Sequence, residues 1–202
     1  LLVVCHHLIA DGQSVSILAD RIITLARGAQ EITASRTDQG LFTYQNGQLA
    51  QPAPEALARR ESFWSENLPR HRVPQLDHWL LASPHEDSAR EFRLTVPHDT
   101  TEAVRNTAQE AEVSEFTVYL AAFGTLLARY AGEDQVSFAS PFMDRPHLEM
   151  ENSIGCFIRT LPVLIDVSPG LRVRDLLKRT RSEVMGLWRN LDFPVARKLS
   201  GL

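Results

Sequence analysis

The spacing of apolar residues divides the chain into alternating strands and helices. An unbroken apolar run at residues 1–5 predicts a buried strand that starts abruptly, as in a piece of a longer polypeptide. A stripe with spacings of three and four then predicts a helix that Ser14 caps and Gly28 ends; its apolar positions are Val15, Leu18, Ile22 and Leu25. Residues 29–57, with their glycines and prolines, are expected to connect this helix to the next through exposed loops.

The rest of the chain repeats this alternation. Further helices are predicted at residues 55–68, 99–111, 114–131 and 169–187, with a capping box of Asp99 and Glu102 and with Ser114 and Gly132 at the ends of the third. Further strands are predicted at residues 92–96, 136–138 and 154–165. Residues 69–90 bridge two units. The predicted fold class is therefore α/β, or α+β in layers.

Composition and charge exclude several classes of protein. Basic residues number 21 and acidic residues 25, which gives a net charge of −4, so we expect no nucleic acid partner. No apolar run approaches the roughly 20 residues that cross a bilayer, and the first residues do not form a signal peptide, so we expect no membrane partner. Cys5 and Cys156 both lie in apolar stretches, which predicts core thiols and a cytoplasmic location.

The pattern His6-His7-x-x-x-Asp11-Gly12 follows the first predicted strand and carries the clearest chemical signal. A buried strand fixes the backbone, and the loop after it presents side chains to a cleft. An imidazole can take and return a proton near neutral pH. The Asp11 carboxylate can fold back to hold the loop, and Gly12 permits an unusual backbone dihedral.

Three simpler interpretations compete with catalysis. His6 is interpreted as a hydrogen-bonded structural residue, and Asp11 as a purely structural carboxylate. His7 and Asp11, four residues apart, have the spacing of metal ligands. Because no third cluster of ligand residues accompanies them, the sequence predicts no metal site.

The histidine pattern resembles the H-H-x-x-x-D-G signature of the condensation domains of non-ribosomal peptide synthetases, which are similar to chloramphenicol acetyltransferase. Other segments resemble motifs of the same family in the same order, and together they span nearly all 202 residues. They are the helix and strand at 114–136, the Ser-Pro-Phe-Met-Asp-Arg run at 140–145, the Ile-Gly-Cys-Phe-Ile-Arg-Thr-Leu-Pro run at 154–162, and Leu-Asp-Phe-Pro at 191–194.

The chain departs from the family pattern at several positions. Arg159 stands where Asn is usual, Asp144 where Gly is usual and Asn190 where His is common. An aromatic-rich motif expected in residues 40–60 is not visible. These departures bear on the subtype more than on the family, whereas Asp144 places an additional carboxylate beside Arg145.

The resemblance implies two chloramphenicol acetyltransferase-like lobes of mixed sheet with flanking helices, the first lobe being incomplete. Residues 1–88 would form the C-terminal part of the N-terminal lobe, with the histidine motif and the bridge. Residues 89–202 would form the C-terminal lobe, truncated at its end. The chain would then be the C-terminal part of a domain about twice as long, and alone it would fold poorly and not turn over substrate.

The resemblance also implies an amide-forming reaction. A donor acyl thioester and an acceptor amine, each on the 4'-phosphopantetheine of a carrier protein, would meet at His7. His7 would act either as a general base or as a group that positions the amine. The implied partners are upstream and downstream peptidyl carrier proteins and an adjacent adenylation domain. The domain itself would bind no cofactor.

Further residues receive roles from the resemblance. His6 and Gly12 join His7 as catalytic candidates, with the Gly12 N–H near the developing oxyanion. Asp11 and Arg145 are expected to form a structural salt bridge. Ser14, besides capping the helix, and Arg159, besides pairing with an acid, are candidates for lining the substrate tunnel.

Two other functions fit the same family. One is a related acyl transfer, by ester formation or by epimerisation of a carrier-bound residue, for which Glu149 and Glu151 are weak candidate acids. The other is a non-catalytic docking module that retains the fold. The intact His6-His7 pair and Gly12 argue against the docking module, whereas Arg159 favours it slightly.

Overall fold

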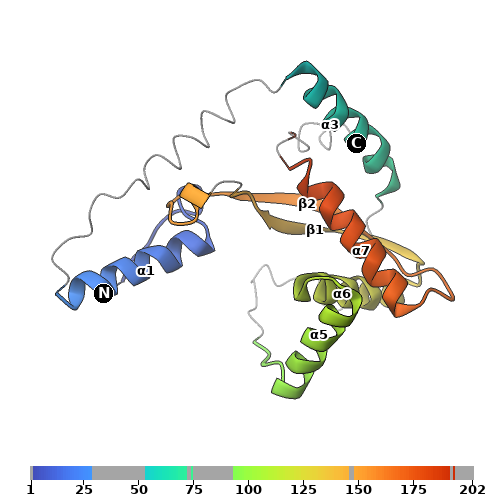
Figure 1. Ribbon diagram of the computed structural model, residues 1–202, viewed down its shortest axis with the longest axis horizontal. Helices are drawn as coiled ribbons and strands as arrows, with labels where there is room; N and C mark the ends of the chain where they lie inside the picture. Colours follow the sequence, from blue (N-terminus) through green and yellow to red (C-terminus); the bar gives the residue numbers. More distant parts are fainter. Residues whose placement is uncertain are drawn as a thin grey trace, which may run out of the picture. The chain divides into compact units, whose positions relative to one another are not determined.

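The structure, a computed structural model, describes residues 2–28, 53–71, 74, 93–145, 148–191 and 193 (Figure 1). This part of the chain has a mixed α/β fold, as predicted. Its elements, in chain order, are α1 (Gly12–Ala26), α3 (Pro54–Asn67), the 3-10 turn η1 (Leu68–Arg70), α5 (His98–Ala111), α6 (Glu115–Ala131), β1 (Gln135–Met143), the 3-10 turn η2 (Leu148–Met150), β2 (Ile158–Asp166) and α7 (Val173–Trp188).

Contacts group the chain into two units that are discontinuous in sequence. The first comprises Leu1–Glu61, Pro141–Thr160 and Leu191–Leu202, and the second comprises Ser62–Ser140 and Leu161–Asn190. The histidine motif lies in the first unit. The predicted domain boundary between residues 88 and 89 lies outside the described residues and stays a prediction.

Strands β1 and β2 pair as a two-stranded antiparallel ribbon. Hydrogen bonds at its two ends set the register: Val167 N donates to Asp134 O at 2.7 Å, and Asp144 N donates to Phe157 O at 2.6 Å. The second strand was predicted to begin at residue 154 but begins at Ile158. Residues 151–157 instead turn toward the start of α1, where hydrogen bonds to α1 hold their backbone.

Three helices form the core of the second unit. Ala111 of α5, Ala121 of α6 and Leu177 of α7 are buried against one another. Helix α6 is capped as predicted, since the Ser114 side chain accepts a hydrogen bond from Thr117 N and Gly132 ends the helix at a φ of 69°. No single helix in the described residues is long and apolar enough to cross a membrane, although α5 and α6 would pass that test together, bent by 105°.

A buried polar cluster connects η1, β1 and α7 within the second unit. His71 Nδ1 lies 3.1 Å from Ser137 Oγ, and His71 Nε2 lies 3.9 Å from Glu183 Oε1. Burial, reinforced by the charge of Arg70, lowers the pKa of His71 to about 4. Burial raises the pKa of Glu183 despite the opposing charge of Arg70. The cluster therefore favours an uncharged imidazole in the folded protein.

Several local predictions are wrong. Residues 2–5 and 93–96, predicted as strands, have no regular structure, and Leu2, Val4 and Leu94 are largely exposed. An apolar run indicates burial, but a strand also needs a neighbour that pairs with its backbone. The first helix residue of α5 is His98, behind Pro97, so Asp99 lies inside the helix instead of capping it. Cys156 is exposed and not a core thiol.

Candidate functional site

The two histidines lie in an exposed turn directly before α1. The turn closes with Ile9 N donating to His6 O at 3.0 Å. His6 Nδ1 accepts a hydrogen bond from Leu8 N at 3.1 Å, so in this arrangement its proton resides on Nε2. His7 lies beside it with an exposed side chain. The turn therefore orients His6 locally and leaves the His7 imidazole accessible for chemistry.

Asp11 caps α1 and is buried. Its Oδ1 accepts from Ser14 N at 2.8 Å, which satisfies an N–H at the first turn that has no partner within the helix. The predicted N-cap, Ser14, is wrong, because Ser14 lies inside the helix and Asp11 holds the extended conformation that precedes it. Gly12 begins the helix and is not among the residues with positive φ, so its predicted unusual dihedral is also wrong.

Arg145 forms a buried ion pair with Asp11. Its Nη2 lies 3.1 Å from Oδ1 and 3.2 Å from Oδ2, and the exposed fractions of the two side chains are 4% and 0%. Arg145 Nη1 donates to the carbonyl oxygens of Met150 at 2.5 Å and of Ser153 at 2.9 Å. The guanidinium lies 4.3 Å above the centre of the Phe157 ring. Arg145 thus joins the turn after η2 to the start of α1.

Ser14 completes these contacts. Its hydroxyl oxygen accepts from Gly155 N at 3.0 Å and from Arg145 Nη2 at 3.2 Å. The same oxygen lies 2.7 Å from Asp11 Oδ1 and 2.8 Å from Gly155 O, and its single proton serves one of these two acceptors. Ser14 has an exposed fraction of 0%, so the hydroxyl offers a substrate no accessible atom in this structure.

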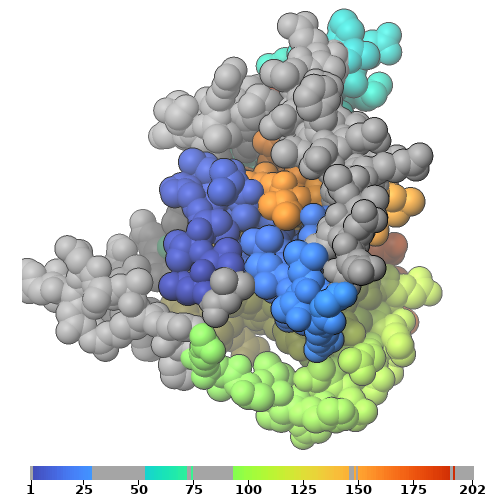
Figure 2. Space-filling view, turned by 90° about the vertical axis from the view of Figure 1, so that its left-hand side faces the viewer, coloured from blue at the N-terminus to red at the C-terminus, as the bar shows by residue number. Residues whose placement is uncertain are grey.

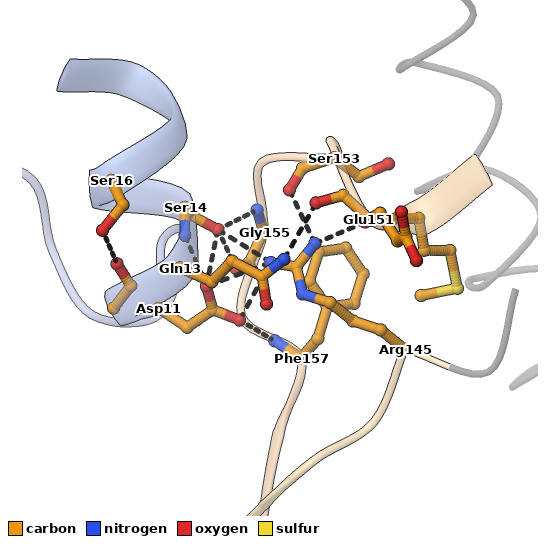
Figure 3. A network of polar contacts seen from close by, with 11 residues as sticks. Asp11, Gln13, Ser14, Ser16, Arg145, Glu151, Ser153, Gly155 and Phe157 are labelled. Atoms are coloured by element: carbon orange, nitrogen blue, oxygen red, sulfur yellow. Dashed lines mark hydrogen bonds and ion pairs between the residues drawn. The ribbon is translucent and has the colours of Figure 1, made fainter. Parts of the chain in front are cut away.

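Backbone groups of residues 155 and 157 bind the same carboxylate and its neighbours. Asp11 Oδ2 accepts from Phe157 N at 3.1 Å, and Asp11 N donates to Gly155 O at 3.1 Å. We call Asp11, Ser14, Arg145, Gly155 and Phe157 the anchor network (Figure 3). Figure 2 shows residues 2–28 in blue beside the orange segment that follows residue 150.

The electrostatics of Asp11 favour its charged form. Burial alone would raise the pKa of Asp11, but hydrogen bonds from Ser14 and Phe157 and the charge of Arg145 hold it below its ordinary value. A carboxylate that is ionised, buried and fully hydrogen-bonded is a poor proton carrier near neutral pH. The arrangement therefore suits Asp11 to holding the loop in place.

Arg159 lies beside the anchor network and pairs with an acid. Its Nε donates to Asp144 Oδ2 at 3.1 Å, with exposed fractions of 33% for the Arg159 side chain and 9% for the Asp144 side chain. Of the two alternatives for Arg159, the structure thus shows the ion pair. Asp144, the additional carboxylate beside Arg145, is bound by this second arginine and leaves the first to Asp11.

Sequence reasoning missed several members of this site. Gly155 and Phe157 belong to the run at 154–162 that matched the family, but neither of these two residues had an assigned role. Ser153 and Met150 contribute backbone carbonyl oxygens, which no side-chain pattern reveals. Within the part of the chain that the structure describes, no three His, Cys, Asp or Glu residues gather as metal ligands.

Comparison with known proteins identifies the family. The model of the condensation domain matches residues 1–197. The chain belongs to the condensation-domain family. Among curated relatives of this domain, tyrocidine synthase 3 of Brevibacillus parabrevis is 27% identical over 197 residues, covering 94% of this chain. Surfactin synthase subunit 1 of Bacillus subtilis is 26% identical over 194 residues, also covering 94%. The chain spans 3% and 5% of these two proteins.

Solved structures share the fold. The first condensation domain of the CDA synthetase aligns with a TM-score of 0.73 at 21% identity, over 93% of this chain and 42% of that one. The epimerization domain from the third module of tyrocidine synthetase B aligns with a TM-score of 0.70 at 17% identity, over 96% and 45%. The chain therefore spans less than half of either structure.

Proposed function

We propose that this chain is part of a non-ribosomal peptide synthetase condensation domain that forms an amide bond between a donor acyl thioester and an acceptor amine. The observation that carries the proposal is the anchor network, which fixes the histidine motif and leaves His7 accessible. Both substrates would be carried on 4'-phosphopantetheine arms of upstream and downstream carrier proteins. An adenylation domain would be the neighbouring partner, as in a multidomain synthetase of the cytoplasm.

The proposed reaction is a nucleophilic substitution at the thioester carbonyl. The neutral amine attacks the carbonyl carbon, a C–N bond forms, and a tetrahedral intermediate carries the negative charge on oxygen. The C–S bond then breaks, and the thiolate takes the proton that the amine nitrogen loses. His7 either transfers that proton or positions the amine and stabilises the intermediate. Either role is worth roughly 10²–10⁴-fold in rate.

The proposal is tested by loading donor and acceptor carrier proteins and following the amide product by mass spectrometry. The assay uses the polypeptide that carries this chain and compares the parent with His7→Ala. We expect the variant to lose roughly 10²–10⁴-fold in the rate of product formation. His98→Ala is the matched control, since the His98 side chain is 86% exposed and lies in the second unit.

Two outcomes would contradict the proposal. Equal product from the parent and from His7→Ala would exclude a role for His7 at the reacting centre. No amide from the parent would exclude condensation under these conditions and would favour a related acyl transfer or a docking module.

A further inference from the structure

Two buried polar atoms of the second unit lie close together without a hydrogen bond. His71 Nε2, directly after η1, is 3.9 Å from Glu183 Oε1 on α7, and the exposed fractions of the two side chains are 8% and 13%. The distance is roughly 1 Å longer than a hydrogen bond. Neither atom has a hydrogen-bond partner among the residues that the structure describes. Because buried polar atoms in folded proteins rarely stay unpaired, these two atoms call for an explanation.

The other polar atoms of both side chains are bound, and these contacts orient the imidazole and the carboxyl group. His71 Nδ1 lies 3.1 Å from Ser137 Oγ on β1. The Glu183 carboxyl group accepts hydrogen bonds from the Leu164 N–H on β2 and from the Asn67 side chain at the end of α3. A small movement that brings Nε2 and Oε1 within hydrogen-bond distance would therefore complete the bonding of both groups.

The charges near His71 disfavour an imidazolium ion. Burial, and then the positive charge of the preceding residue Arg70, lower the pKa of His71 to about 4. Arg70 itself has acidic neighbours, since its Nη1 is 4.0 Å from Glu183 Oε2 and it lines a pocket together with Glu133 and Asp134. At neutral pH the imidazole is therefore uncharged, with its one proton on either Nδ1 or Nε2.

The influences on Glu183 act in opposite directions. Burial raises the pKa of Glu183, and the charge of Arg70 and the hydrogen bonds to the carboxyl group offset this rise only in part. The cavity beside Glu183 is also lined by Asp166, Lys178 and Arg179, of which Arg179 pairs with Asp166 at 3.0 Å. Glu183 therefore ionises at a higher pH than an exposed glutamate does, while the imidazole beside it is neutral.

We propose that His71 and Glu183 form a proton switch, in which the ionisation of Glu183 decides which imidazole nitrogen carries the proton. With the carboxyl group protonated, its O–H donates to Nε2, so the imidazole proton lies on Nδ1 and is donated to Ser137 Oγ. When the carboxyl group loses its proton to solvent, the carboxylate accepts from Nε2–H, and Nδ1 accepts from the Ser137 hydroxyl. One proton leaves the pair, one moves from Nδ1 to Nε2, and the hydrogen bond to β1 reverses its direction.

The switch concerns contacts of η1, β1 and α7 and goes beyond amide formation, so its test needs no substrate. The polypeptide that carries this chain is labelled with ¹⁵N-histidine, and the imidazole ¹⁵N signals are recorded between pH 4.5 and pH 8. Protonated and unprotonated ring nitrogens have well-separated signals, so the spectrum reports the tautomer. The signals of His71 are assigned by their loss in His71→Gln.

We expect the His71 tautomer to change from Nδ1–H at the low end of this range to Nε2–H at the high end, with the ratio of the two shifting by about tenfold or more. In Glu183→Gln, whose amide group does not ionise, the ratio should not depend on pH. Ser137→Ala and Thr180→Val are matched controls. They remove the hydroxyl next to Nδ1 and a buried hydroxyl without a described partner one turn before Glu183, and both should retain the pH response.

Two outcomes in the parent alone would overturn the proposal: a tautomer ratio that is the same at every pH, and an imidazolium ion at His71 near neutral pH. A pH response that survives in Glu183→Gln would also overturn it, because another group would then control the proton. Loss of the response in Thr180→Val would show that Glu183 acts on His71 through this hydroxyl, and would overturn the direct contact.

Discussion

At the scale of single residues, the site depends on the Asp11 carboxylate, both of whose oxygens accept hydrogen bonds. Asp11 accepts from a side-chain hydroxyl or a backbone amide at each oxygen and from the Arg145 guanidinium at both. Such a group contributes geometry more than net stability, because an intact buried ion pair only offsets the desolvation of its two charges. Removing one partner is different, since it leaves the other charge buried and uncompensated.

Replacement of Arg145 tests that asymmetry. We expect Arg145→Leu to lower the free energy of unfolding by about 3–5 kcal/mol, because Asp11 is then buried without a cation. Arg105→Leu, which breaks the exposed pair with Glu115, should lower it by less than about 1 kcal/mol. Urea unfolding followed by circular dichroism measures both. Similar losses in the two variants would contradict the interpretation of Asp11 and Arg145 as a buried anchor.

The sequence indicated which side chains belong to the site, but it indicated less well which contacts they form. The histidine motif was selected from its place after an apolar run, and Arg145 from its position in a family-like segment. The place of Ser14 was wrong because serine and aspartate are both good helix caps, and residues 11–14 offer one of each. The backbone groups of Gly155 and Phe157 could not be foreseen, since any residue type supplies an amide.

At the scale of elements, α6 packs against β2 with no space to spare at Gly124. A Cβ built on Gly124 would lie 2.5 Å from Ile165 Cγ1, which is closer than real contacts allow. Gly186 in α7 is less restricted, since a Cβ there would lie 3.3 Å from the ring of Phe63. The close approach of α6 to β2 therefore depends on glycine, which has no Cβ, at position 124.

The two glycines give a matched comparison. Alanine favours a helix by about 1 kcal/mol over glycine at either position. At Gly124 the clash with Ile165 should exceed that gain, so Gly124→Ala is expected to lower the melting temperature, by overpacking of roughly 1–3 kcal/mol. Gly186→Ala should leave the melting temperature unchanged or raise it slightly. A higher melting temperature for both variants would show that α6 can move away from β2.

Elements with strong local signals were predicted well. Ser114 and Gly132 define α6 because the cap and the left-handed stop are properties of a few neighbouring residues. The segments at 2–5 and 93–96 were not predicted correctly, since a strand depends on a pairing partner that a local pattern does not specify. The start of β2 was misplaced for a similar reason, because Gly155 forms its hydrogen bonds with Asp11 and Ser14 at the start of α1.

At the scale of the whole molecule, stability is expected to depend on pH through His71. The folded protein binds a proton on His71 only near pH 4, whereas an unfolded chain binds one near pH 6.5. Stability from the neutral imidazole is therefore complete above pH 6.5 and is lost as the pH falls toward 4. The loss amounts to at most about 3 kcal/mol. Glu183 has the opposite effect: because its pKa is raised, its contribution to stability is lost as the pH rises.

Comparing variants across pH isolates this contribution. Between pH 7 and pH 4, the free energy of unfolding of His71→Gln should fall less steeply than that of the parent. His98→Gln, which replaces an exposed histidine, should retain the slope of the parent. Urea titrations at closely spaced pH values give the slopes. The same slope for the parent and His71→Gln would exclude His71 as the titrating group.

The ion pairs Asp11–Arg145 and Asp144–Arg159 differ in how often recombination between two related genes would separate their members. Asp11 and Arg145 are separated by 134 positions, whereas Asp144 and Arg159 are separated by 15. A crossover between residues 15 and 144 would take Asp11 from one parental gene and Arg145 from the other, but it would transfer Asp144 and Arg159 together. A chimaera of two family members therefore retains the anchor only if both parents encode it, while it inherits the second pair as a unit.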